Sequence, residues 1–205
     1  EIIVSEEGPK AINDDYEKLP SLNYIGIMLC FVFRSVQNII MANVETNNNS
    51  FIAHMFNYTK QTNSYVASGL VSATGFLGFV FLVCYVWTGT AKKVSNTLGV
   101  FIGFVVCLIF FLGSFPYPFY DGYIEKPNCS WCSTTTTISF PVYTIVYLLL
   151  FAVGFPLVSV HTSALLAKHL EGRKQAHWHG LSNFVSTVAR IAAGSLVGTA
   201  FQALG

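Results

Sequence analysis

The sequence predicts an all-α membrane protein in which several helices cross the bilayer. Of its 205 residues, 53% are hydrophobic and only 10% are charged, against about 25% charged residues in an ordinary soluble domain. A hydrocarbon layer about 30 Å thick takes about 20 apolar helical residues to cross, and five windows are that long. The net charge of +1 provides no basic field for nucleic acid. The expected partner is therefore the lipid bilayer, and no nucleic acid is expected.

The five expected spans follow one another along the chain with polar segments between them. They cover residues 22–44, 66–87, 98–115, 140–166 and 181–204. Residues 1–20 are acidic and poor in apolar side chains, which is typical of a solvated linker. We expect a cytosolic linker at 1–20, followed by membrane helices over 21–205. Because the chain starts at Glu1 rather than Met, we also expect it to be a piece of a longer protein.

Lysine and arginine are distributed unevenly between the two sides that alternate along such a chain. One side holds only Lys60 and Lys126, whereas the basic side holds Lys10, Lys18, Lys92, Lys93, Lys168, Arg173 and Lys174. Cytosolic loops carry the excess of basic residues in membrane proteins. The basic side is therefore predicted to be cytosolic, and the loops at 45–65 and 116–139 to be lumenal.

Glycosylation sequons and a cysteine pair give two further cues to orientation. The Asn-x-Ser/Thr sequons are at Asn48, Asn57 and Asn128, all in the loops assigned to the lumen. Cys129 and Cys132 lie there too. A zinc ribbon needs a second such pair and a redox motif needs a thioredoxin-like unit, so a disulfide in an oxidising lumen is the favoured interpretation. The cysteines would bond to each other or to another part of the protein.

Arg190 stands near the middle of the last expected span. An arginine there costs about 2.5–3.5 kcal/mol on insertion scales, so it should face protein or water rather than lipid. At 100° per residue, Asn183, Thr187 and Arg190 share one face of the helix. This face is expected to look into a polar cavity. The alternative is a structural arginine that pairs with a carboxylate and fixes helix packing.

Two other spans carry similar polar stripes. Arg34, Asn38 and Glu45 share a face of the first span, and Tyr147 and His161 share a face of the fourth. Polar stripes on three helices are typical of the walls of a water-filled path for a solute or ion. Solvation at the lumenal interface explains Glu45 equally well, and a histidine at the cytosolic interface explains His161.

The sequence contains no pattern that indicates catalysis. It has no glycine-rich phosphate loop, no Gly-x-Ser-x-Gly and no metal-binding triad. We therefore expect no enzyme activity, no cofactor and no metal site.

The C-terminal part of the sequence contains three motifs: Gly154-Phe155-Pro156, a turn at 172–176 and Ala189-Arg190-Ile191. With these motifs it resembles the tenth and eleventh helices of major facilitator superfamily transporters, in a branch with lysosomal members. "NVETN" around Glu45 resembles the end of the family's seventh helix, and "NCSWC" resembles a cysteine-bearing lumenal loop. The resemblance implies that the five spans are helices 7–11 of twelve. It also implies a partner, the N-terminal six-helix half of the same protein.

The expected function is transport of a small anionic or zwitterionic solute by alternating access. The resemblance implies a lysosomal or endosomal membrane. Arg34 and Arg190 would attract the anionic group, and Glu45 would carry a coupling proton. Two alternatives remain: an anion channel on the same fold and a membrane scaffold that transports nothing.

Overall fold

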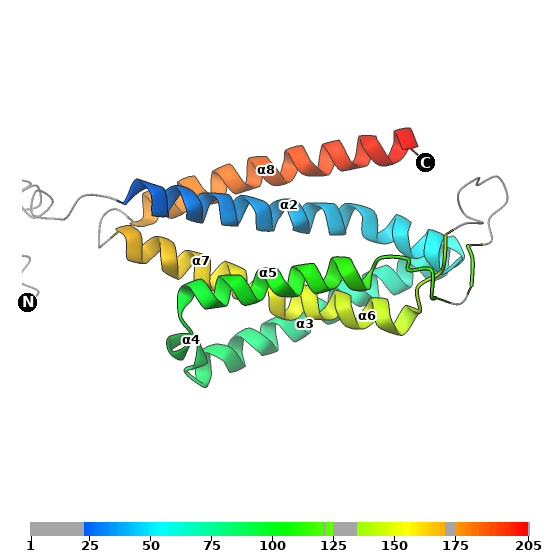
Figure 1. Cartoon of the computed structure of the whole chain (residues 1–205), viewed down its shortest axis with the longest axis horizontal. Helices are drawn as coiled ribbons and strands as arrows, with labels where there is room; N and C mark the ends of the chain where they lie inside the picture. The colour runs from blue at the N-terminus through cyan, green and yellow to red at the C-terminus, as the bar shows by residue number, and fades with distance from the viewer. Residues whose placement is uncertain (1–22, 121, 125–134, 171–174, 205) are drawn as a thin grey trace, which may run out of the picture.

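The computed structural model describes residues 23–120, 122–124, 135–170 and 175–204, and this part of the chain is almost entirely helical (Figure 1). The helices are α2 (Tyr24–Met55), α3 (Lys60–Trp87), the short α4 (Thr90–Lys93), α5 (Asn96–Gly113), α6 (Phe140–Leu149), the π-helical η2 (Leu150–Gly154), α7 (Phe155–Leu170) and α8 (Gln175–Leu204). The only β-type pairing in the described ranges is an isolated bridge between Tyr123 and Thr136. The prediction of an all-α protein is confirmed.

Four of these helices are long and apolar enough to cross a membrane. They are α2, α3, α5 and the continuous helix Phe140–Leu170, which joins α6, η2 and α7. They overlap the first four expected spans, and by length and composition they fit a multi-pass membrane protein. The fifth expected span lies in α8, which is 30 residues long but, with its many polar residues, is not among the four.

The ends of the helices alternate between the two ends of the bundle. The start of α2, the short α4 and the end of α7 lie at one end, and the connection from α2 to α3 lies at the other (Figure 1). Lys92 and Lys93 lie in α4 and Lys168 in the last turn of α7, whereas Lys60 begins α3. The three described basic residues of the expected cytosolic side, Lys92, Lys93 and Lys168, therefore lie at the same end of the bundle.

The first helix is longer than expected and removes most of the loop expected at 45–65. α2 continues to Met55 through a run of asparagines, which have low helix propensity. Side chains from neighbouring helices offset that propensity: Asn63 Nδ2 of α3 donates to Asn49 Oδ1 (2.7 Å), and the hydroxyl of Tyr143 in α6 donates to Asn48 Oδ1 (2.7 Å). α2 and α3 are therefore joined by only a short connection.

The longer helix corrects one glycosylation prediction. Asn48 lies within α2, 5% exposed and bonded to Tyr143, whereas a glycan acceptor has to be accessible on the surface. Asn57 is exposed in the connection between α2 and α3, so its glycosylation stays a prediction. Asn128, Cys129 and Cys132 lie outside the described residues, as do 1–20 and most of the turn at 172–176.

The continuous helix Phe140–Leu170 packs against α2, α3 and α5, and α8 lies mainly along α2. The helix Phe140–Leu170 contains a π-turn at Leu150–Gly154, followed by Pro156, which has no N–H to donate. Gln37 of α2 meets this irregular segment by donating from Nε2 to the carbonyl of Phe155 (2.9 Å). A Cβ on Gly103 of α5 would lie 3.0 Å from the Gly154 carbonyl, so the two backbones pack directly together.

Much of the outer surface is apolar. Phe76 and Phe79 of α3 and Phe101 of α5 are each at least 65% exposed. Exposed apolar surface on this scale is unfavourable in water and marks a membrane or protein contact. The apolar surface of the bundle therefore suits lipid.

Candidate substrate path between α2, α7 and α8

Glu45 and Arg190 form an ion pair that links α2 to α8. Nη2 of Arg190 donates to Oε2 of Glu45, and the side chains of Arg190 and Glu45 are 42% and 39% exposed, respectively. The sequence placed the two residues on polar stripes of different helices, and the structure brings these stripes face to face. The carboxylate of Glu45 explains how a charged residue is accommodated in the middle of α8. This pairing is the one expected if Arg190 has a structural role in helix packing.

An open cleft of about 520 Å³ surrounds this pair. Its lining consists of Asn38, Ala42, Glu45 and Thr46 from α2 and Thr187, Arg190, Ile191, Gly194 and Ser195 from α8. Small residues such as Ala42 and Gly194 leave the space between the helices, while charged and polar side chains line it. The cleft can therefore hold water and a small polar solute.

Arg34 joins three helices one turn before Asn38. Its Nη1 donates to Ser163 Oγ (3.0 Å), Ser159 Oγ (3.3 Å) and the Ser159 carbonyl (3.4 Å) of α7. Its Nη2 donates to Asn183 Oδ1 of α8 (3.0 Å). All of these acceptors are neutral, so the guanidinium is held by dipoles and not by a counter-charge.

The local charge balance around the cleft is positive. Glu45–Arg190 is the only ion pair among the described residues. Two guanidinium groups therefore face one carboxylate, and the charge of Arg34 is left without an acidic partner in the described part of the chain. In a low-dielectric surrounding an excess positive charge favours an anion nearby.

The remaining polar residues of the two stripes are anchored to their own helices. Asn38 Nδ2 donates to the carbonyl of Arg34 (3.0 Å), and Thr187 Oγ1 donates to that of Asn183 (2.8 Å). Asn38 and Thr187 line the cleft, and Asn183 lies one turn from it beside Arg34. The structure thus brings together six predicted site residues: Arg34, Asn38, Glu45, Asn183, Thr187 and Arg190.

Tyr147 and His161 do not line the cleft. Tyr147 is 1% exposed in the apolar core, where its ring packs on Phe110 and Phe151. His161 is also 1% exposed, which excludes a solvated histidine at the interface.

His161 instead joins α3, α5 and α7. Its Nε2 lies 2.7 Å from the hydroxyl of Tyr85, and its Nδ1 lies 3.2 Å from Asn96 Oδ1. Since that oxygen only accepts, Nδ1 donates, and in the neutral ring Nε2 accepts from Tyr85. Gly99 of α5 leaves the space that the imidazole fills.

Sequence reasoning missed the residues that hold Arg34. Ser159 and Ser163 are four residues apart in α7, a spacing that puts both hydroxyls on one face. That spacing was a usable signal, but serines are common at helix contacts in membranes. Which helix they face depends on the tertiary structure.

The described residues contain no metal site, since no three His, Cys, Asp or Glu side chains in them are placed to share an ion. Cys30, Cys84 and Cys107 are free thiols. Comparison with known proteins adds no identification: no family of known proteins, no curated protein and no solved structure matches this chain. The functional argument therefore depends on the cleft and on the residues around it.

Proposed function

We propose that this chain is part of a secondary transporter that moves a small anionic or zwitterionic solute across a membrane. The observation that carries the proposal is the polar cleft between α2 and α8, with Glu45 and Arg190 in its walls. Placing such charges between apolar membrane helices is costly, and functional paths are where membrane proteins retain them. A protein that only scaffolds other proteins has no use for a hydrated cleft.

The excess positive charge supports an anionic group on the solute. Arg34 presents a planar guanidinium whose present acceptors, Ser159, Ser163 and Asn183, are all neutral. A carboxylate or similar anion binds guanidinium more strongly than these neutral groups do. We propose that the anionic group of the solute is attracted to the Arg34 end of the cleft.

Glu45 is the proposed site of proton coupling. While it is ionised, it holds Arg190 in the ion pair. Protonation removes the negative charge and frees the Arg190 guanidinium for the solute. Proton binding at Glu45 and solute binding at Arg190 would then favour each other, which is the requirement for coupled transport.

The resemblance of the sequence to the major facilitator superfamily supports alternating access as the mechanism. In this proposal the chain supplies helices 7–11, and the N-terminal six-helix half closes the other side of the cleft. The membrane would be that of lysosomes or endosomes, with the 45–65 and 116–139 segments on the lumenal side.

The test is solute uptake by the full-length protein in proteoliposomes. A panel of monocarboxylates, dicarboxylates and amino acids is supplied with and without an inward proton gradient. We expect saturable, gradient-dependent uptake of at least one anionic or zwitterionic compound, with the gradient dependence lost in Glu45→Gln. Gradient dependence that persists in Glu45→Gln contradicts the coupling role.

Two other outcomes reject the carrier. Ohmic conductance far above carrier rates, measured in patches, identifies an anion channel. Absence of uptake and of conductance across the panel, with folded protein in the vesicles, favours the scaffold. Ser72→Ala, on the exposed face of α3, is the matched control for both assays.

A further inference from the structure

The α2–α8 cleft contains neutral polar side chains to which the proposed function gives no role. Asn38 and Thr46 of α2 and Thr187 and Ser195 of α8 line it together with the ion pair. From residue 38 to residue 46 the α2 wall is about 12 Å long. The cleft holds about 520 Å³, within the range of about 300–1,000 Å³ of small-molecule sites. It therefore has room for a solute that extends well beyond one charged group.

Three of these side chains offer mainly hydrogen-bond acceptors. Thr187 Oγ1 and Ser195 Oγ donate to carbonyl groups one turn earlier in α8 (2.8 and 3.0 Å). Their hydroxyl protons are engaged within the helix, while oxygen lone pairs stay available. Asn38 uses Nδ2 on a carbonyl of its own helix, and its Oδ1 accepts no hydrogen bond from the described part of the chain. A solute that donates hydrogen bonds suits this lining.

Thr46 adds a hydroxyl group that is free to donate as well as to accept. Its Oγ1 makes no hydrogen bond within the described ranges. A Cβ built on Gly194 would lie 3.8 Å from that oxygen, so the hydroxyl faces the α8 backbone next to Ser195. Thr46 and Ser195 therefore line the same end of the cleft, from opposite walls. Hydroxyl groups of a solute can accept from Thr46 and donate to Ser195.

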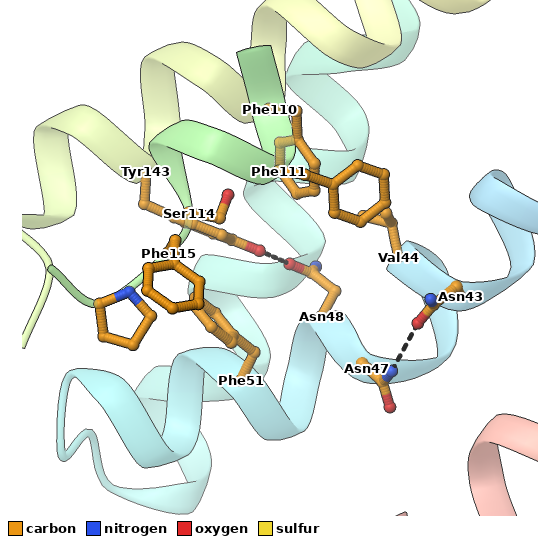
Figure 2. A pocket seen from close by; sticks show the side chains of 11 residues that line it. Asn43, Val44, Asn47, Asn48, Phe51, Phe110, Phe111, Ser114, Phe115 and Tyr143 are labelled. Atoms are coloured by element: carbon orange, nitrogen blue, oxygen red, sulfur yellow. Dashed lines mark hydrogen bonds between the residues drawn. The ribbon is translucent and has the colours of Figure 1, made fainter. Parts of the chain in front are cut away.

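The cleft differs in this respect from a cavity between α2, α5 and the start of α6 (Figure 2). In that cavity phenylalanine rings dominate, and polar side chains bond to one another: Asn47 Nδ2 donates to Asn43 Oδ1 (2.8 Å) and the Tyr143 hydroxyl to Asn48 Oδ1 (2.7 Å). Among the described residues that line the α2–α8 cleft, none is aromatic. An aromatic solute finds no ring there on which to stack, whereas an aliphatic, hydroxylated solute finds polar partners.

The charge of the lining restricts the solute further. Glu45 and Arg190 are the only charged residues among the described lining residues. In the proposed coupling step Glu45 is protonated, which leaves one guanidinium in the lining to match one carboxylate. The ammonium group of an amino acid would then lie near Arg190 without a carboxylate to balance it. A monoanion therefore fits the protonated cleft better than a zwitterion.

We propose that the solute is a polyhydroxylated monocarboxylate, the chemical class of the sugar acids. Its carboxylate binds Arg190 on the side towards Arg34, and its hydroxylated chain extends to Thr46 and Ser195. The inference rests on the proposed function, since it names the substrate class of the same cleft. A plain carboxylic acid of equal length leaves the polar groups of the closed cleft unpaired, so the cleft discriminates against it.

The test compares hydroxylated and plain acids as solutes of the full-length protein in proteoliposomes with an inward proton gradient. Gluconate, galactonate and glucuronate are the hydroxylated probes, and hexanoate has the same number of carbons without hydroxyl groups. We expect saturable uptake of at least one hydroxylated probe and none of hexanoate. Ser195→Ala and Thr46→Val each remove one hydroxyl and should raise KM for that probe about threefold to tenfold with kcat unchanged. Ser72→Ala, on the exposed face of α3, should leave KM unchanged.

A binding measurement separates failure of the substrate class from failure of transport. A ligand that binds the folded protein raises the midpoint of thermal unfolding. In detergent at acidic pH, the transported probe should raise it in the wild type and in Ser72→Ala, and less in Ser195→Ala. Such stabilisation without uptake of any compound supports the site and rejects the transporter.

Three results would overturn the substrate class. The first is uptake of hexanoate or alanine with no uptake of the hydroxylated probes, which keeps the transporter but assigns it a plain acid or a zwitterion. The second is that no hydroxylated probe is taken up or stabilises the protein. The third is an unchanged KM in both Ser195→Ala and Thr46→Val. Because the two variants lie on different helices, one that does not fold leaves the other to decide.

Discussion

Glu45 and Arg190 lie 145 positions apart in the sequence, yet their side chains form an ion pair between α2 and α8. The pair allows an arginine to stand in the middle of a mostly apolar helix. It also lies in an open cleft whose other lining residues are mostly small or polar. The same two side chains can therefore stabilise the helix pair and contact a solute in the cleft, and mutations can separate these two roles.

Neutralising one member of the pair should destabilise the protein more than neutralising both. Glu45→Gln leaves Arg190 without a counter-charge, and Arg190→Gln leaves Glu45 without one. Exposed pairs contribute about 0.2–1 kcal/mol, and a side chain left charged and alone costs more where water is partly excluded. We expect each single variant to lower the midpoint of thermal unfolding in detergent, by about 2–4 °C per kcal/mol. The double variant should recover most of that loss.

The charge-reversed variant Glu45→Arg/Arg190→Glu distinguishes packing from solute contact. It restores an ion pair between α2 and α8 but moves the positive charge to the other wall of the cleft. We expect recovered stability without recovered uptake. Full recovery of uptake would assign Arg190 a structural role only.

Arg34→Lys should weaken the contact between α2, α7 and α8 although it keeps the charge. The guanidinium reaches Ser163 and Asn183 with two different nitrogens, each at 3.0 Å, whereas an ammonium is a single point. A hydrogen bond to a charged group contributes about 1.5–3 kcal/mol, so we expect a loss of that size in the free energy of unfolding. Ser163→Ala, which removes only one acceptor, should lose less. An Arg34→Lys variant as stable as the wild type would show that charge alone matters.

The sequence was informative where the decisive feature lay within one helix. The spacing of Arg34, Asn38 and Glu45, and that of Asn183, Thr187 and Arg190, defined two polar faces, and the structure brings them together. Spacing does not specify the neighbour of a face, so Tyr147 and His161 were assigned to the path although both are buried in contacts with other helices. The asparagine run of α2 is assigned from the sequence to a polar loop because it lies between two apolar spans. It is helical because Asn63 and Tyr143 bond to it from α3 and α6, which no local pattern reveals.

Gly99→Ala should disrupt the contact between α5 and α7. A methyl group at Gly99 would overlap the imidazole of His161, which is held on its other sides by Tyr85 and Asn96. Inserting a methyl group into such packing costs about 1–3 kcal/mol. Gly75→Ala in α3 is the control, because nothing lies within 4 Å of a Cβ there and alanine favours a helix by up to about 1 kcal/mol. The midpoint of thermal unfolding should therefore fall in Gly99→Ala and rise in Gly75→Ala. Equal shifts in the two variants would contradict the packing of His161 against Gly99.

Asn57 and Asn48 should differ in glycosylation although each begins a sequon. Asn57 is exposed between α2 and α3, whereas Asn48 is 5% exposed and accepts a hydrogen bond from Tyr143. With Asn128 replaced by Gln, we expect Asn57→Gln to abolish the change in gel mobility that a glycosidase produces. Asn48→Gln should leave that change intact but lower the midpoint of thermal unfolding, because it displaces the buried partner of the Tyr143 hydroxyl. A glycan on Asn48 would require the end of α2 to unfold in the membrane-inserted protein, and would contradict a helix that continues to Met55.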